Sequence, residues 1–505
     1  MRPYATTATP PPASPQGGHG DPANAPVTLA GFVRRPRVLA TTTRLALLTL
    51  AILGLLDAVG GRRPYFGGDF YHFWVVGIVA REGLSPNFYA PEEQVRLAGV
   101  FAERVRPHTP PLMWQRLVRY PLDLTATPLL YMTFTPFSTL PYATAWRTYQ
   151  FLSLLLGVAA VILLGELFQV TVENTLLLIA LLGWGIVDLL RCDVNTGNVN
   201  ALQLLGFALL TWIAGGRRWT HWRGVSLGAL LGLLLLFKPN FWPVVPILGV
   251  WCITERTIGD ILSIAGGALA VGAAALGATA AFFGSMRVWQ HWLDAARAYA
   301  ARKIPTTVAL DQGFNQWWLN RTGQEIWMEL TLGVFAIVVL TVAAAIFLRL
   351  REARDSHRPG PADNPAATAD RQDAAFRRFS ALLGVGLIGS LICGPHIWLH
   401  YYLMALIPAL AWLGTRANAG ERAGSLRTIA RPVLTLIGLC TLGLAGSGSG
   451  FANLVGAYYA ERWTAVRLAG LAILFAIAVA QLWTAYRRDA GALTGREAAG
   501  WCAPR

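Results

Sequence analysis

A series of long apolar runs, separated by short polar segments, constrains the fold more than any other feature of this chain. Of its 505 residues, 54% are hydrophobic and 14% are charged, and the mean hydropathy is +0.45. A soluble protein carries about 25% charged residues. Apolar runs of about 15–25 residues are typical of helices that cross a bilayer. The sequence therefore predicts an all-α, polytopic membrane protein.

About twelve membrane spans are expected. They fall at about 40–59, 142–167, 174–190, 197–214, 223–238, 241–254, 258–283, 327–350, 378–393, 399–415, 427–446 and 464–486. Short Arg-rich loops then lie on one side, which the positive-inside rule identifies as the cytoplasm. Both termini are expected there, and the natural location is the cell (plasma) membrane.

Three regions are predicted. Residues 1–37 are rich in Pro, Ala, Gly and Thr and read as a disordered cytoplasmic tail. Residues 38–486 form the transmembrane domain, with a disordered cytoplasmic linker at 351–377. Residues 487–505 form a second cytoplasmic tail. No cleavable signal is expected before the first span.

The long first outer loop holds the main topological ambiguity. It is expected to contain an interfacial helix over 71–82 and an amphipathic stretch over 91–106. The apolar segment 122–140 is broken by Pro128 and Pro136. We interpret this segment as re-entrant or interfacial, since irregular backbone at membrane depth must be buried in protein or line a cavity. If it spans instead, every later loop changes side.

Charge and cysteine content exclude several classes of function. The formal net charge of +15 fits cytoplasmic arginines, and no nucleic-acid-binding pattern accompanies it, so no nucleic-acid partner is expected. The five cysteines are scattered singly, without the spacing of a metal site.

Asp69 is the first candidate for chemistry. It lies in the segment Gly67–Trp74 among apolar and aromatic neighbours. Such surroundings disfavour a charged carboxylate and tend to raise its pKa. A carboxylate poised in this way is a candidate general base. A solvated acid in a loop is the plainer interpretation.

Other polar residues fall on the same predicted outer side. They are Asp193, Asn195, Asn198, Lys238, Asn240, Asp311, Asn315, His396 and His400. Lys238 and Arg191 are candidate cations for a lipid-linked phosphate, although a lysine that snorkels from a helix end is equally plausible. The patch around Asn315 suits sugar binding or an interfacial tryptophan belt. The two histidines lack a third metal ligand.

Several of these segments, taken in order, resemble glycosyltransferase family 87, whose members are GT-C-type enzymes that use polyprenyl-phosphate sugars, notably mannose. The matching segments are Gly68-Asp69-Phe70, Phe88-Tyr89, Tyr120-Pro121, Gly197–Asn200, Phe237-Lys238-Pro239, Phe314-Asn315-Gln316 and Pro395–His400.

This resemblance implies a GT-C-like fold with extracytoplasmic interfacial helices and an extracytoplasmic active site. It implies Asp69 as catalytic base, aided by His400, in an inverting transfer from a polyprenyl-phosphate donor to a glycan or glycolipid acceptor. The donor phosphate is expected at Lys238, Arg191 and His396. Tyr89, Tyr120, Asn198, Asn240, Asn315 and Gln316 are the expected substrate-binding residues. No metal or cofactor is expected, and membrane lipids are expected partners.

Two other functions stay open at this point. A lipid or polysaccharide transporter would need polar residues near mid-membrane and broken helices in two related halves. A scaffold without enzymatic activity is the second. The acceptor, the sugar and the oligomeric state are not indicated by the sequence.

Overall fold

The computed structural model is helical throughout the residues that it describes, and no strand occurs among them. These residues are 36–60, 67–106, 121–216, 219–300, 313–356, 365–394, 397–414, 434–435, 437–439 and 457–488. The chain divides into two units, Met1–Ala46 and Leu47–Arg505. The first unit contributes only the start of helix α2 to the described residues, and the second holds everything discussed below.

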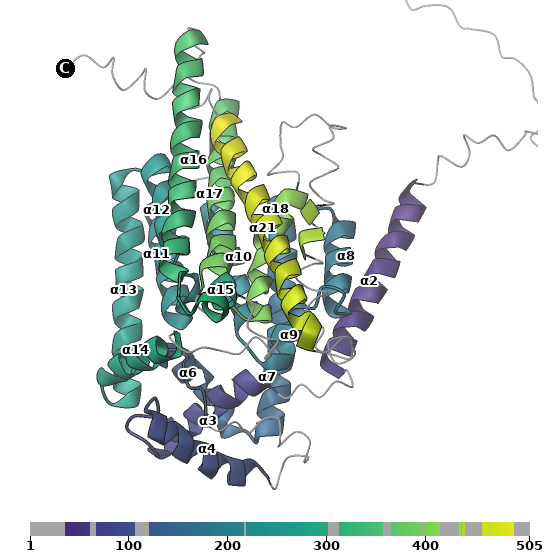
Figure 1. Ribbon diagram of the computed structural model, residues 1–505. Coiled ribbons are helices and arrows are strands. Elements are labelled where there is room, and N and C mark those ends of the chain that lie inside the picture. Colours follow the sequence, from purple (N-terminus) through teal and green to yellow (C-terminus); the bar gives the residue numbers. More distant parts are fainter. Residues whose placement is uncertain are drawn as a thin grey trace, which may run out of the picture. The chain divides into compact units, whose positions relative to one another are not determined.

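The elements follow one another in a simple order (Figure 1). They are α2 (Pro36–Gly60), α3 (Gly68–Glu82), α4 (Pro91–Val105), α6 (Pro128–Phe134), η3 (Thr135–Thr139), α7 (Tyr142–Phe168), α8 (Val172–Gly183), α9 (Leu189–Thr196), α10 (Asn200–Ala214), α11 (His221–Phe237), η4 (Pro239–Phe241), α12 (Val244–Glu255), α13 (Ile258–Phe283), α14 (Arg287–Ala300), α15 (Phe314–Thr322), α16 (Trp327–Ser356), α17 (Pro365–Cys393), η5 (Leu399–Ala405), α18 (Leu406–Leu413) and α21 (Ala457–Arg488).

Six of the described helices are long and apolar enough to cross a membrane. They lie at Ala40–Gly60, Tyr142–Phe168, Ile258–Phe283, Trp327–Leu348, Gln372–Cys393 and Val466–Arg487. The expected twelve spans are not confirmed, because α8, α10, α11, α12 and the 400–413 segment have only 10–17 residues. A helix of 12 residues rises about 18 Å, which is less than the bilayer core of about 30 Å.

Two expectations about the chain path differ from the structure, and the expectation that segment 122–140 does not span agrees with it. The expected span 174–190 is interrupted after Gly183, because Gly185 adopts a left-handed φ of 69° before α9 begins. The segment 122–140 holds the seven-residue α6 and the short η3, and neither is long enough to cross a bilayer. The expected disordered linker is helical up to Ser356 and again from Pro365, where alanines and charged residues favour a helix.

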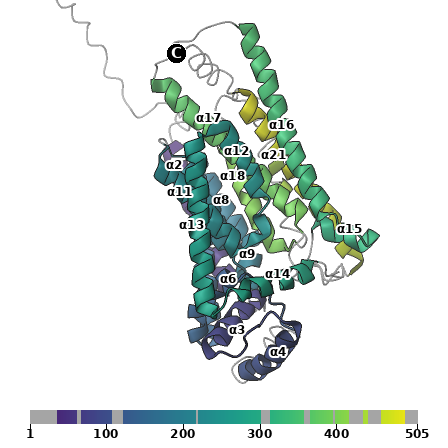
Figure 2. The ribbon, with the colours of Figure 1, turned by 90° about the vertical axis from the view of Figure 1, so that its left-hand side faces the viewer.

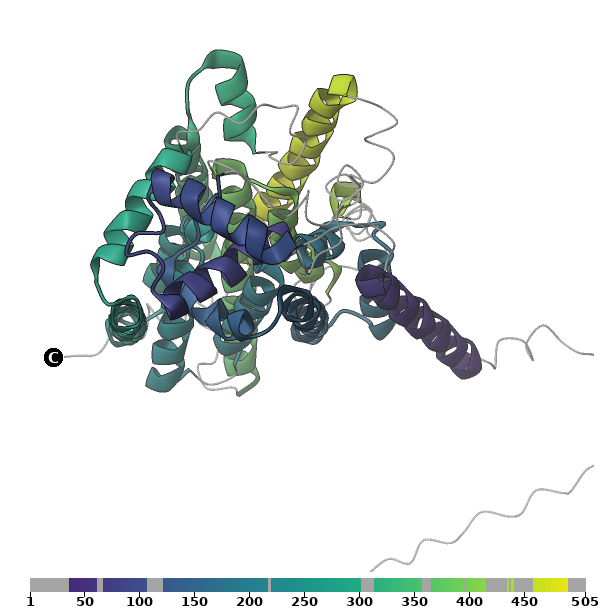
Figure 3. The ribbon, with the colours of Figure 1, turned by 90° about the horizontal axis from the view of Figure 1, so that it is seen from below.

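One end of the second unit is built from short helices packed through aromatic side chains. Helices α3, α4, α6 and α14 lie at this end (Figure 1), and α4 crosses the ends of longer helices when they are viewed from below (Figure 3). Phe70 of α3 stacks on Tyr149 of α7 with a centroid distance of 5.0 Å. Phe73 of α3 contacts Phe134 of α6 at 4.8 Å. These contacts fix α3, the helix that carries Asp69.

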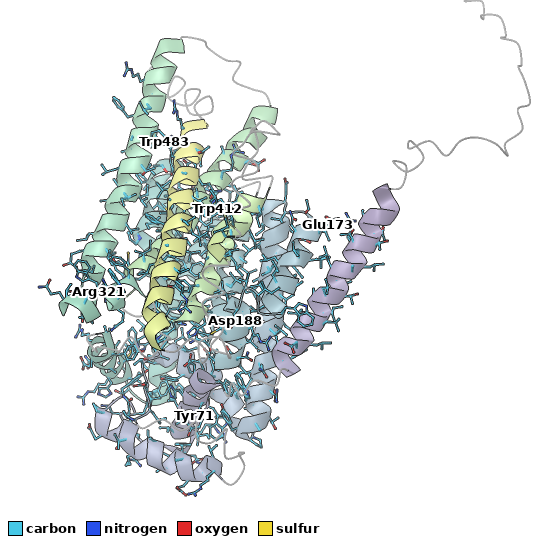
Figure 4. The ribbon with its side chains drawn as sticks, turned by 45° about the vertical axis from the view of Figure 1, so that its right-hand side comes forward. Tyr71, Glu173, Asp188, Arg321, Trp412 and Trp483 are labelled. Carbon is cyan, nitrogen blue, oxygen red and sulfur yellow. The ribbon has the colours of Figure 1, made fainter. Side chains whose placement is uncertain are left out.

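The opposite end is held by two arginines, of which Arg378 is buried and Arg256 is half-buried. Arg378 of α17 pairs with Glu255 of α12 at 2.7 Å, and both side chains are buried. Arg256 lies 3.5 Å from the Trp219 ring centroid and 4.4 Å from that of Trp251. Figure 4 shows Trp412 and Trp483 on the path from this end toward Asp188 and then Tyr71 of α3. The two ends of the unit therefore differ in chemistry.

Helix α11, which ends at Lys238, is fixed by a close contact with α13, and Figure 2 shows the two helices side by side. A Cβ at Gly267 would lie 2.1 Å from the Val225 carbonyl oxygen, and a Cβ at Gly228 would lie 1.8 Å from that of Ile264. Small residues allow helix backbones in membranes to approach this closely. The position of Lys238 thus depends on two glycines far from it in space.

Neighbouring glycines on α13 provide a matched test of this contact. Gly267→Ala should lower the free energy of unfolding by about 1–3 kcal/mol, because its methyl group overlaps backbone atoms of α11. Gly266→Ala should be neutral or stabilising by up to about 1 kcal/mol, since no atom lies within 4 Å of its added Cβ. Thermal unfolding of both variants in detergent measures the difference. Equal melting temperatures would contradict the close α11–α13 contact.

Candidate active site

Asp69 lies in the first turn of α3 rather than in a loop. Its side chain is 27% exposed, so a bound molecule can reach the carboxylate. The N-terminus of a helix favours negative charge, because its first N–H groups point toward that charge. Asp69 is thus an acid at an accessible edge of the fold, beside the positive end of a helix.

Two glycines allow α3 to begin there. Gly67, the N-cap of α3, has a φ of 63°, and a Cβ on it would lie 2.5 Å from the Trp146 ring. Gly197, the C-cap of α9, has a φ of 74°, and a Cβ on it would lie 2.5 Å from the Cβ of Phe70. Only glycine combines a left-handed conformation with such close contacts. The end of α9 is therefore brought against the start of α3.

The Asp69 carboxylate contacts two other predicted site residues. Asn198 Nδ2 donates a hydrogen bond of 2.6 Å to Asp69 Oδ2. The Nε2 atom of His400, on η5, lies 3.9 Å from the same oxygen, too far for a hydrogen bond. Burial lowers the pKa of His400, which favours the neutral imidazole. Residues separated by more than 300 positions in the sequence thus meet at one carboxylate.

Lys238 is buried directly behind this contact, at the C-cap of α11. Its Nζ donates to Asn198 Oδ1 at 2.6 Å and to Asn200 Oδ1 at 2.9 Å. The same nitrogen lies 4.0 Å from the centroid of the Tyr401 ring. The ammonium group is therefore surrounded by acceptors supplied by the protein.

Asp193 completes the cluster from the buried side. Its Oδ1 accepts from Asn200 Nδ2 at 2.8 Å, and its Oδ2 accepts from the backbone N–H of Ala201 at 2.9 Å. Burial raises the pKa of Asp193, and burial likewise lowers the pKa of Lys238, while the attraction between the two charges opposes both shifts. Asp193, Asn200, Lys238, Asn198 and Asp69 form one continuous hydrogen-bonded chain, which we call the Asp69 network.

The remaining predicted site residues lie elsewhere in the fold. Arg191 pairs with Asp57 of α2 at 2.8 Å. Asn315 is buried, and its Oδ1 accepts from the Ile326 N–H at 2.8 Å. Gln316 is also buried, and Asn240 lies half-buried in η4. Tyr120 and His396 lie outside the described residues.

Tyr89 lines a cavity of about 470 Å³ at the same end of the fold as α3. Its hydroxyl donates to the Ala126 carbonyl at 2.7 Å. The polar residues of the cavity are Asn87, Gln94, Asp123, Thr125, His291 and Asp294. Tyr89 contacts Tyr131, which contacts Phe73 of α3, so the cavity wall is continuous with the Asp69 helix. A volume of this size suits a small ligand.

Sequence reasoning did not assign a role to Asn200, Asp193 or Tyr401 in the site. Asn200 follows Asn198 by two positions at the start of α10, and this spacing around a helix start was the available signal. The partner of Arg191, Asp57, gave no signal, because it lies within the first apolar run.

Within the part of the chain that the structure describes, no three His, Cys, Asp or Glu side chains form a group that could hold a metal ion. The expectation that no metal is required stays a prediction.

Residues 125–362 match the family model of glycosyltransferase family 87. The matched region contains Asn198, Asn200 and Lys238, and it ends before His400 and begins after Asp69. No curated protein and no solved structure matches the chain. This match supports the resemblance to glycosyltransferase family 87 seen in the sequence, and it indicates a membrane glycosyltransferase.

Proposed function

We propose that this glycosyltransferase moves a hexose, mannose being the best candidate, from a polyprenyl-phosphate donor to an extracytoplasmic glycan or glycolipid. The observation that carries the proposal is the convergence of Asp69, Asn198, Lys238 and His400 at an accessible carboxylate. An acceptor hydroxyl needs a base within hydrogen-bond reach, and Asp69 is a partly exposed carboxylate held by a neutral amide.

The reaction is an in-line displacement. Asp69 takes the proton of the acceptor hydroxyl, and the oxygen forms a bond to the anomeric carbon of the sugar. The bond between that carbon and the phosphate oxygen breaks, and the polyprenyl phosphate leaves with the electron pair. A single displacement inverts the anomeric configuration, whereas retention would need a second carboxylate acting as nucleophile. Asp193 is not suited to that role, because it is fully buried and bound by Asn200 and Ala201.

His400 is proposed to assist at the same centre. Its imidazole lies beside Asp69 Oδ2, where it can orient the carboxylate or donate to the leaving phosphate. The family resemblance supports this role, and the short distance between the two side chains agrees with it.

The cavity bounded by Tyr89 and Asp123 is proposed as the acceptor pocket. Its carboxylates and amides can accept and donate hydrogen bonds to sugar hydroxyls, and its tyrosines can stack on a sugar ring. We also infer that this end of the protein faces away from the cytoplasm. Arg256 and Arg378 belong to the opposite end, and the positive-inside rule favours arginines on the cytoplasmic side.

Asp69→Asn should lower kcat by about 10²–10⁴-fold, because the amide cannot accept the acceptor proton. The KM for the donor should stay within about threefold of the wild type, since loss of a base affects the transition state. Purified protein is incubated with radiolabelled polyprenyl-phosphate mannose and membrane lipids, and the labelled product is quantified. Glu103→Gln is the matched control, an acid-to-amide change on the exposed surface of α4. Unchanged product formation by Asp69→Asn would contradict the assignment of the base.

Asp123→Asn should raise the KM for the acceptor about 5–10-fold, because a hydrogen bond to a charged acceptor is weakened. The KM for the donor and kcat should stay near the wild-type values, since the cavity is proposed to hold only the acceptor. Initial rates at varied acceptor with saturating donor give the acceptor KM, and rates at varied donor with saturating acceptor give the donor KM. A rise in the donor KM instead would assign the cavity to the donor.

A further inference from the structure

Lys238 is an unusual residue for this chain. It is one of only two lysines among 42 basic residues, all the others being arginines. Its side chain is buried, with 8% exposure. An ammonium group is a compact point charge with three donors, whereas a guanidinium is a wide planar fork. A small site that needs several hydrogen bonds from one point favours lysine.

The Lys238 donors are directed at protein acceptors. Two of them bond Asn198 Oδ1 and Asn200 Oδ1, and the ammonium also faces the Tyr401 ring. A phosphate oxygen would have to displace one of these partners. The geometry therefore does not favour direct contact between Lys238 and a donor phosphate.

The contact with Lys238 fixes the orientation of the Asn198 amide. An asparagine amide can present either its oxygen or its nitrogen to a neighbour. Asn198 Oδ1 accepts from both Lys238 Nζ, at 2.6 Å, and the Val199 N–H, at 2.8 Å. Its Nδ2 is then the atom that faces Asp69 Oδ2. The reversed amide would place its oxygen against the carboxylate, where the two would repel each other.

The second arm of the Asp69 network fixes Lys238 itself. Asn200 Oδ1 accepts from Lys238, and Asn200 Nδ2 donates to Asp193. Asp193 in turn accepts the Ala201 N–H at the start of α10. The lysine is thus held between two amides. The oxygen of each amide accepts from the lysine, and its nitrogen donates a hydrogen bond to one carboxylate.

We propose that Lys238 is a positioning residue, which acts through Asn198 to hold the Asp69 carboxylate in the orientation needed to accept the acceptor proton. This inference rests on the proposed function, in which Asp69 is the base. It replaces the direct phosphate-binding role expected for Lys238 from the sequence.

Lys238→Met keeps an unbranched side chain that is one atom shorter, and it removes the donors. We expect kcat to fall about 10²-fold, because small misplacements of a catalytic group have effects of this size. The KM for radiolabelled polyprenyl-phosphate mannose should stay within about threefold. A donor KM raised tenfold or more with kcat retained would show that Lys238 binds the phosphate and would overturn the proposal. Unchanged values of both would overturn it as well.

Asn198→Asp provides a test that does not depend on the lysine variant folding. It places a second carboxylate against Asp69, and a like charge so close raises the pKa of a neighbouring acid. The acidic limb of the kcat/KM profile should move about one pH unit or more to higher pH. If Asn198 had only a structural role, Asn198→Asp would lower kcat/KM at every pH without moving the acidic limb. An unmoved limb would therefore overturn the proposal. Asn174→Asp, the same change at an exposed position of α8, should leave the profile unchanged.

Before the acidic limb of the kcat/KM profile is assigned to Asp69, the other titratable groups whose charges interact with Asp69 are considered. They are Tyr131 on α6, Tyr149 on α7, Cys192 on α9, Lys238 and His400. Asp69→Asn is assayed in parallel. Retained turnover in Asp69→Asn would mean that the proposed base is wrong. An inactive Asp69→Asn with normal Lys238→Met and Asn198→Asp would mean that only the positioning role is wrong.

Discussion

The geometry of the candidate active site depends on one amide group, that of Asn198, which lies between a carboxylate and a buried ammonium. Its nitrogen binds Asp69 and its oxygen binds Lys238. The three residues come from different parts of the chain. Asp69 lies at the start of α3, Asn198 in the turn between α9 and α10, and Lys238 at the end of α11. The glycines Gly67 and Gly197 bring the first two together, and Gly267 sets the third by its contact with α13. Close contacts at these three glycines therefore decide the surroundings of the carboxylate.

The Asp69 network also has a charge balance that suits a base. Two acids, Asp69 and Asp193, share one cation, Lys238, through two neutral amides. Uptake of a proton by Asp69 removes the surplus negative charge. The buried ammonium is stabilised by amide oxygens and an aromatic ring rather than by water, which offsets part of its desolvation. Because the amide that contacts Asp69 is neutral, the carboxylate can still accept a proton. A directly paired cation would oppose this by lowering the pKa of the carboxylate.

Much of the site was predictable from the sequence, because short polar segments in an apolar chain stand out. Asp69, Asn198, Lys238 and His400 all stand out in this way. Three of them are linked by hydrogen bonds, and His400 lies beside them. The number of spans was not predictable. Composition marks an apolar run but does not distinguish a helix that crosses the bilayer from a shorter one buried among its neighbours, as α12 and α18 show. Pairings such as Arg191 with Asp57 depend on tertiary contacts between distant segments.

The most direct test of the account is an experimental structure with a non-transferable analogue of polyprenyl-phosphate mannose bound. The account predicts the anomeric carbon near the Asp69 carboxylate, with room for an acceptor hydroxyl between them at about 3–3.5 Å from the reacting atom. It also predicts that Lys238 keeps its bonds to Asn198 and Asn200. A sugar bound at the opposite end, beside Arg256 and Arg378, would contradict the account.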